Sequence, residues 1–173
     1  RVKSKVYFIK VNDADDLQVR RAKFVHLLDK SNLLDFIGQS QRVVVKMHFG
    51  EDGNTGFVKP EYVREVCQRI IKKQASPLLS DTNTLYRGRR LTTEEHIKLA
   101  YEHGFTKDTT GADLIIADDR KEGGTTDIKI NQKFIRVAKI ATLFLAADAI
   151  VGLAHFKGHM MTGFGGALKN LGM

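Results

Sequence analysis

Short apolar runs alternate along this chain with stretches whose apolar residues recur every three or four positions. Runs of this kind are typical of buried strands, and the longer spacing is typical of helices that cover a sheet. The runs predict strands at 6–11, 42–49, 78–79, 113–117 and 149–154. The spacing predicts helices from Asp13 or Asp15 to before Gly38, from Pro60 through Ile71, from Thr92 or Thr93 to about His103, over 139–147, and from Ala167 onward.

Strands that alternate with helices predict an α/β fold, a mostly parallel sheet with helices on both faces. Two short apolar segments, 127–130 and 134–137, are compatible with an extra β-hairpin near 125–138. No repeat, linker or low-complexity tract divides the chain, so we expect a single α/β domain over residues 1–173. The last predicted helix stops soon after it starts, which indicates a fragment of a longer protein.

The charge and the cysteine content narrow the function classes. The formal net charge is +8, but the basic residues are spread out and do not alternate with aromatic residues, so nucleic-acid binding is not favoured. Anionic small molecules remain plausible ligands.

Cys67 is the single cysteine, which excludes a disulfide framework and a four-thiolate cluster within this chain and favours the cytoplasm. No apolar run reaches the roughly 18 residues of a membrane span, so no membrane association is expected.

Polar residues follow three of the predicted strands, where parallel sheets bind their ligands. Lys46 and His48 lie two positions apart and therefore point to the same side of their strand. A lysine in an apolar strand suits an anionic partner, although both residues also fit a structural role. Asp81 and Asn83 follow the next strand, where they could hold a polar ligand or a metal, or form an ordinary turn. The loop 86–90 adds basic residues that either contact an anion or are solvated.

The segment 155–170 combines histidines, lysines and glycines between a predicted strand and a predicted helix. Glycine permits close approach of the backbone to a ligand, and the free N–H groups of a helix start favour an anion. Neither a Walker sequence nor a complete dinucleotide fingerprint is present. The candidate residues of this segment are His155, Lys157, His159, Gly163, Gly165, Gly166, Lys169 and Asn170.

Together, the three polar segments resemble the protein family known as domain of unknown function 362. The resemblance extends from about Val43 to Met173, and its most specific part is the run Gly165–Gly172. Many members of that family join this domain to a ferredoxin-like module with two four-iron clusters, so the resemblance implies a redox-associated protein. The cluster-binding cysteines have no counterpart here, so no cofactor is expected within this chain. Any 4Fe–4S clusters would belong to a module outside it.

Three functions remain open from the sequence. In the first, an anionic small molecule binds at the carboxyl edge of the sheet of a redox-associated protein, and His48, His155 or His159 acts as an acid or base. In the second, a metal-dependent enzyme uses His48, Asp81, His155 and His159 as ligands. In the third, the basic face is a non-enzymatic docking module for a ferredoxin-like partner. The ligand-binding set of the first hypothesis is Lys46, Asp81, Asn83, Lys157, Gly163, Gly165, Gly166, Lys169 and Asn170.

Overall fold

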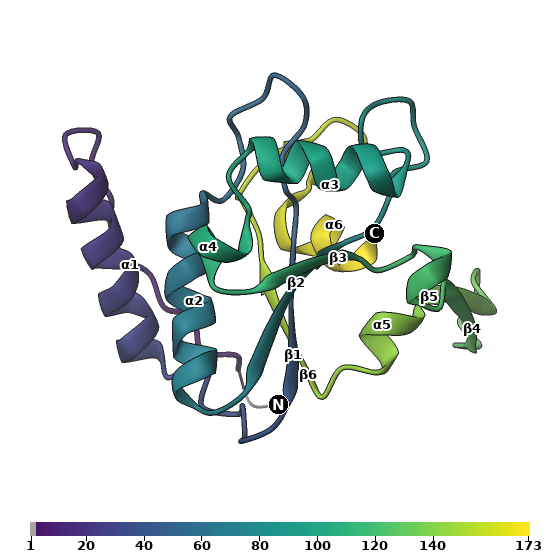
Figure 1. Ribbon diagram of the computed structural model, residues 1–173, viewed down its shortest axis with the longest axis horizontal. Helices are drawn as coiled ribbons and strands as arrows, with labels where there is room; N and C mark the ends of the chain where they lie inside the picture. Colours follow the sequence, from purple (N-terminus) through teal and green to yellow (C-terminus); the bar gives the residue numbers. More distant parts are fainter. Residues whose placement is uncertain (1–2) are drawn as a thin grey trace.

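A four-stranded parallel sheet forms the centre of the computed structural model, which describes residues 3–173 (Figure 1). Its strand order is β3-β2-β1-β6. The bounds are β1 (Arg42–Met47), β2 (Ser76–Asp81), β3 (Asp113–Ile116) and β6 (Ala149–Leu153). In β1 every residue after Arg42 is buried, as expected for a central strand covered on both faces. The predicted α/β fold is confirmed.

Register places three strand ends at one level. Lys46 of β1 lies opposite Ser80 of β2 and Gly152 of β6. Because the strands are parallel, the segments that follow them leave the sheet at the same edge. The polar segments selected from the sequence are therefore brought to one edge by the fold.

One face of the sheet is covered by α2 (Pro60–Lys72), α3 (Thr93–Glu102) and α4 (Lys107–Thr110). Pro60 begins α2, where its missing N–H has no partner to lose. Helix α1 (Leu17–Ser31) lies outside α2, and Phe24 packs edge-on against Tyr62 at 5.3 Å between ring centroids (Figure 1). The N-cap of α1 is Asp16, not Asp13 or Asp15 as predicted, because its carboxylate accepts the N–H of Val19.

The opposite face carries a smaller core and shorter elements. Helices α5 (Thr142–Leu145) and α6 (Gly166–Gly172) lie there, and a hairpin of β4 (Thr125–Lys129) and β5 (Val137–Ala141) projects to the right in Figure 1. The expected extra hairpin is confirmed, with its second strand three residues later. The helix predicted over 139–147 is wrong for residues 139–141, because that backbone pairs with β4.

The strand predicted near the start of the chain does not form. Residues 6–11 form no strand, and their apolar side chains Val6 and Phe8 are exposed. A strand needs a neighbour to complete its hydrogen bonds, and β-propensity alone does not supply one.

Between β6 and α6, the chain forms a short antiparallel ribbon of β7 (Gly158–His159) and β8 (Gly163–Phe164). A 3₁₀ turn, η1 (Arg120–Glu122), follows β3. Within residues 3–173, no helix has the length and apolarity needed to cross a bilayer.

Candidate functional site

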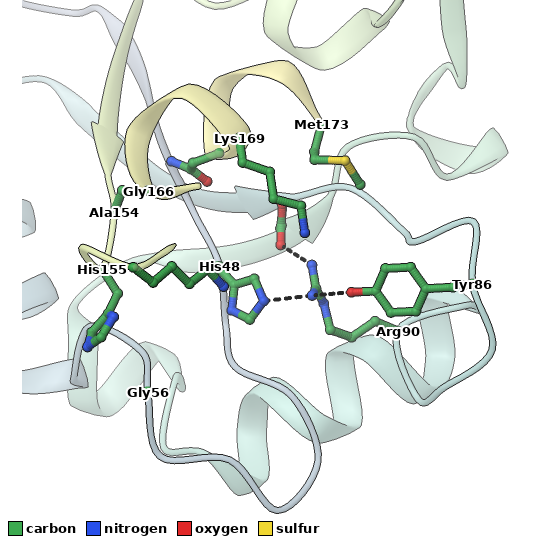
Figure 2. Close-up of a pocket in the computed structure, with 12 residues that line it drawn as sticks. His48, Gly56, Tyr86, Arg90, Ala154, His155, Gly166, Lys169 and Met173 are labelled. Atoms are coloured by element: carbon green, nitrogen blue, oxygen red, sulfur yellow. Dashed lines mark hydrogen bonds and ion pairs between the residues drawn. The ribbon is translucent and has the colours of Figure 1, made fainter. Parts of the chain in front are cut away.

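A pocket opens at the carboxyl edge of the sheet, where β1, β2 and β6 end (Figure 2). Its walls come from segments far apart in sequence: the end of β1, the loop after β2, the terminal loop and α6. The lining residues are His48, Gly56, Asp81, Tyr86, Arg90, Ala154, His155, Lys157, Gly166, Lys169, Asn170 and Met173.

Asp81 is the central carboxylate of this site. It ends β2 and is only 3% exposed. Its Oδ1 accepts a hydrogen bond from Lys46 Nζ at 3.1 Å, and its Oδ2 accepts one from Arg90 Nη2 at 2.8 Å. Burying charges is costly unless they are paired and hydrogen-bonded, and this arrangement pairs all three. Lys46 itself lies beneath the pocket rather than in its wall.

Arg90 joins Asp81 to the rest of the site. The loop after β2 folds back on itself, since the Thr84 N–H donates to the Arg90 carbonyl at 2.9 Å. This turn directs Arg90 inward, where Nη1 donates to Glu51 and Nε donates to His96 Nε2 at 3.2 Å. The Tyr86 hydroxyl donates to the same Glu51 oxygen at 2.6 Å and points toward Arg90 in Figure 2.

The sequence left this basic loop open between anion contact and solvation. In the structure, two neighbouring arginines of this loop differ: Arg89 pairs with Glu102 at the surface, whereas Arg90 is buried. Glu51 and His96 belong to the site, although neither was among the residues predicted from the sequence. No local pattern marks them, because their partner Arg90 lies in a different segment.

Two histidines of the site are held neutral near pH 7. Burial, and then the charge of Arg90, lower the pKa of His48 to about 4 and that of His96 to about 3. His96 accepts from Arg90 at Nε2, and its Nδ1 faces the Asn83 side-chain oxygen at 3.4 Å. Asn83 thus orients His96 from behind the pocket.

His48 has both ring nitrogens against protein groups. Its Nδ1 accepts the Gly50 N–H at 2.9 Å, and its Nε2 lies 2.8 Å from Arg90 Nη1. Because Nδ1 of the neutral ring accepts a hydrogen bond, the proton lies on Nε2, whose nearby acceptor is Glu51 Oε1 at 3.5 Å. His48 is thus held in the pocket wall by Gly50, Arg90 and Glu51, and the acid–base role considered from the sequence stays a prediction.

Two lysines supply the uncompensated charge. Lys157, from the terminal loop, and Lys169, from α6, are both half-buried. Within residues 3–173, neither has a carboxylate within ion-pair distance. Burial lowers the pKa of Lys157, and the charges of Lys169 and Arg90 lower it further. Figure 2 shows Lys169 extending toward Arg90.

Asn170 completes the wall. It is 9% exposed, and its Nδ2 donates to the Lys46 carbonyl at 2.9 Å. Its Oδ1 is buried and has no hydrogen-bond partner within the described residues. The amide orientation follows from chemistry, because the carbonyl of Lys46 can only accept a hydrogen bond.

Most of the predicted residues lie at this site. Five do not line the pocket. Lys46 and Asn83 contact site residues from outside the lining, and His159, Gly163 and Gly165 lie in or next to the β7-β8 ribbon. His155 is exposed at the rim, and its ring points away from Arg90 in Figure 2. Those predicted residues that do come together are Lys46, His48, Asp81, His155, Lys157, Gly166, Lys169 and Asn170.

The metal ligands considered from the sequence do not assemble. His48 and Asp81 both contact Arg90, a cation, and His159 lies outside the pocket. Over the part of the chain that the structure describes, no three histidine, cysteine, aspartate or glutamate side chains come together as a metal-ligating group.

Comparison with known proteins gives one match. The model of the family described as Domain of unknown function (DUF362) matches residues 43–173, from β1 through α6. No curated protein and no solved structure matches the chain.

Proposed function

The chain belongs to the DUF362 family, and we propose that its pocket binds a small anionic molecule at the carboxyl edge of the sheet. The observation that carries this proposal is the pair of half-buried lysines, Lys157 and Lys169, that lack carboxylate partners in residues 3–173. Like charges in a partly desolvated site repel each other, and an anion between them relieves that repulsion.

The charges of the whole site support an anionic ligand. Four cationic side chains meet two carboxylates, and the two buried histidines contribute no charge at pH 7. The pocket thus carries two positive charges in excess. The cations are Lys46, Arg90, Lys157 and Lys169, and the carboxylates are Glu51 and Asp81.

The ion pairs within the site separate the cations that are already compensated from those that are free to bind a ligand. Arg90 and Lys46 are already paired with Asp81, so their charges are compensated within the protein. Lys157 and Lys169 have free ammonium donors to offer a ligand. Ligand binding is better supported than catalysis, because the two lysines offer free donors whereas the unprotonated nitrogen of His48, Nδ1, is already engaged by the Gly50 N–H.

Calorimetry tests the proposal directly. We expect sulfate, phosphate or a small carboxylate to bind the wild-type domain, and Lys157→Ala or Lys169→Ala to weaken binding about tenfold or more, since a hydrogen bond to a charged group contributes roughly 1.5–3 kcal/mol. Lys133→Ala is the matched control, because it removes the same charge from the exposed hairpin loop. Equal affinity in all four proteins would overturn the proposal.

A redox association is a second proposal, supported by an exposed apolar cluster on the loop that carries Lys157. Phe156, Met160 and Met161 are almost fully exposed there. Exposed apolar side chains beside basic ones suit a docking surface, and a ferredoxin-like partner is the one that the family resemblance implies. We expect a purified ferredoxin to bind the domain, more weakly at high salt and more weakly after Met160→Ser with Met161→Ser. An affinity for ferredoxin that is the same at high salt and in the Met160→Ser, Met161→Ser variant would count against this second proposal.

A further inference from the structure

Asn170 bears on the chemistry of the ligand, not only on its charge. Its Oδ1 is a buried acceptor with no partner in the described residues, in a side chain that lines the pocket. Native structures leave few buried polar atoms unpaired, because the loss of solvation is not recovered. An acceptor in this condition, in the wall of a pocket, is available to a donor on a bound molecule.

The position of this acceptor is tightly held. Asn170 Nδ2 is bound to the Lys46 carbonyl, so turning the amide over would set two acceptors against each other. Helix α6 packs against β6 at this point, since a Cβ at Gly152 would be in ordinary van der Waals contact with Leu171 at 3.6 Å and with Asn170 Nδ2 at 4.0 Å. The hydrogen bond to the Lys46 carbonyl is what sets the direction of Oδ1.

Protein donors of the pocket floor are already engaged elsewhere. Lys46 Nζ is bound to Asp81, and the nitrogens of Arg90 are bound to Asp81, Glu51 and His96. Among the lysines and arginines at the pocket, Lys157 and Lys169 keep ammonium groups with no hydrogen-bond acceptor in residues 3–173, and the proposed anion would occupy them.

We infer that the ligand combines an anionic oxygen group, held by Lys157 and Lys169, with an O–H or N–H donor that reaches Asn170 Oδ1. This inference rests on the proposed anion-binding function. Two kinds of molecule share that chemistry: a protonated phosphate, which carries a P–OH group, and a carboxylate with a neighbouring hydroxyl or amino group.

Matched pairs of anions test the inference on the wild-type protein. At pH 8, sulfate and hydrogen phosphate are both mostly tetrahedral dianions, and only hydrogen phosphate carries an O–H. Acetate and glycolate form the corresponding carboxylate pair. We expect the donor-bearing member of at least one pair to bind roughly tenfold or more tightly, and the pair that shows this preference identifies the source of the anionic group.

Asn170→Leu should remove the preference and leave binding of the donor-free anion in place. The wild-type comparison needs no variant, so the inference stays falsifiable if Asn170→Leu fails to fold. Equal affinities within both pairs would overturn the inference and leave the anion-binding proposal standing, with water or a lysine satisfying Oδ1. No binding of any of the four anions would overturn both.

Discussion

Replacing Asp81 by asparagine tests whether the buried charge cluster is organised as described. The substitution keeps the shape of the side chain and removes the charge that pairs with Lys46 and Arg90. Two buried cations are then left with Glu51 as the remaining carboxylate of the cluster. Removing one partner of a buried ion pair costs about 3–5 kcal/mol, and we expect a loss of that order in the free energy of unfolding.

The chain contains a matched control for this prediction. Lys107 and Asp113 form an ion pair with an N–O distance of 3.0 Å, nearly that of the 3.1 Å pair between Lys46 and Asp81. The side chains of the control pair are 69% and 65% exposed, against 3% and 4% for the buried pair. Asp113→Asn should therefore cost only about 0–1 kcal/mol. Burial, not distance, accounts for the predicted difference.

Urea denaturation of the two variants and the wild type measures this difference. The midpoint should fall markedly for Asp81→Asn with an unchanged slope, which indicates a loss of stability without a change in the surface exposed on unfolding. Added sulfate should recover part of the loss, because the variant pocket carries one more uncompensated positive charge. Equal costs for Asp81→Asn and Asp113→Asn would refute the reasoning.

Three further predictions follow from groups around the pocket and in the core. Protonation of His48 and His96 is favoured in the unfolded chain over the folded one, so stability should fall as the pH drops from about 6.5 toward the folded pKa values of about 4 and about 3. Two such protons give a slope of up to about 2.7 kcal/mol per pH unit, and urea midpoints that stay flat between pH 6.5 and 5 would contradict this. Gly166→Ala should destabilise the domain by about 1–3 kcal/mol and weaken anion binding, because φ is +45° and the new Cβ would lie 2.6 Å from the Phe164 ring. Gly172→Ala is the control, since a Cβ there meets open space, and calorimetric melting should show it to be neutral or slightly stabilising. Burial raises the pKa of Cys67 to about 12, so a thiol reagent at pH 8 should modify it only in denaturant, and rapid labelling of the native protein would be inconsistent with the structure.

The accuracy of the predicted elements depended on where their hydrogen bonds are made. The run at 42–49 contains β1, because a central strand needs apolar residues on both faces. Equally apolar residues at 6–11 form no strand, since no strand pairs with them in the described structure. Residues 139–141 carry a helical pattern but pair with β4 instead. Pairing between distant segments overrode local preference in both cases.

The candidate site was predicted only in part, because some of its residues are brought together by contacts between distant segments. Lys46 and Asp81 were found because strand ends of a parallel sheet share an edge, and the alternation of elements already predicted such a sheet. Arg90 was left open between anion contact and solvation, and Glu51 was not selected, because each lies in a loop whose course depends on contacts with the other. The β7-β8 ribbon likewise moved His159 out of the pocket wall.

The sequence by itself determined the α/β class, the central strands and the edge at which polar residues gather, because these follow from local periodicity and from the geometry of parallel sheets. Tertiary structure alone decided which charges are compensated. Arg90 and Lys46 were assigned to Asp81, whereas Lys157 and Lys169 were left with no carboxylate in the described residues, and Asn170 with an unpaired buried oxygen. Charge compensation depends on distances of about 3 Å between side chains from different elements, as between Lys46 and Asp81 or between Arg90 and Asp81, and no local pattern encodes those distances.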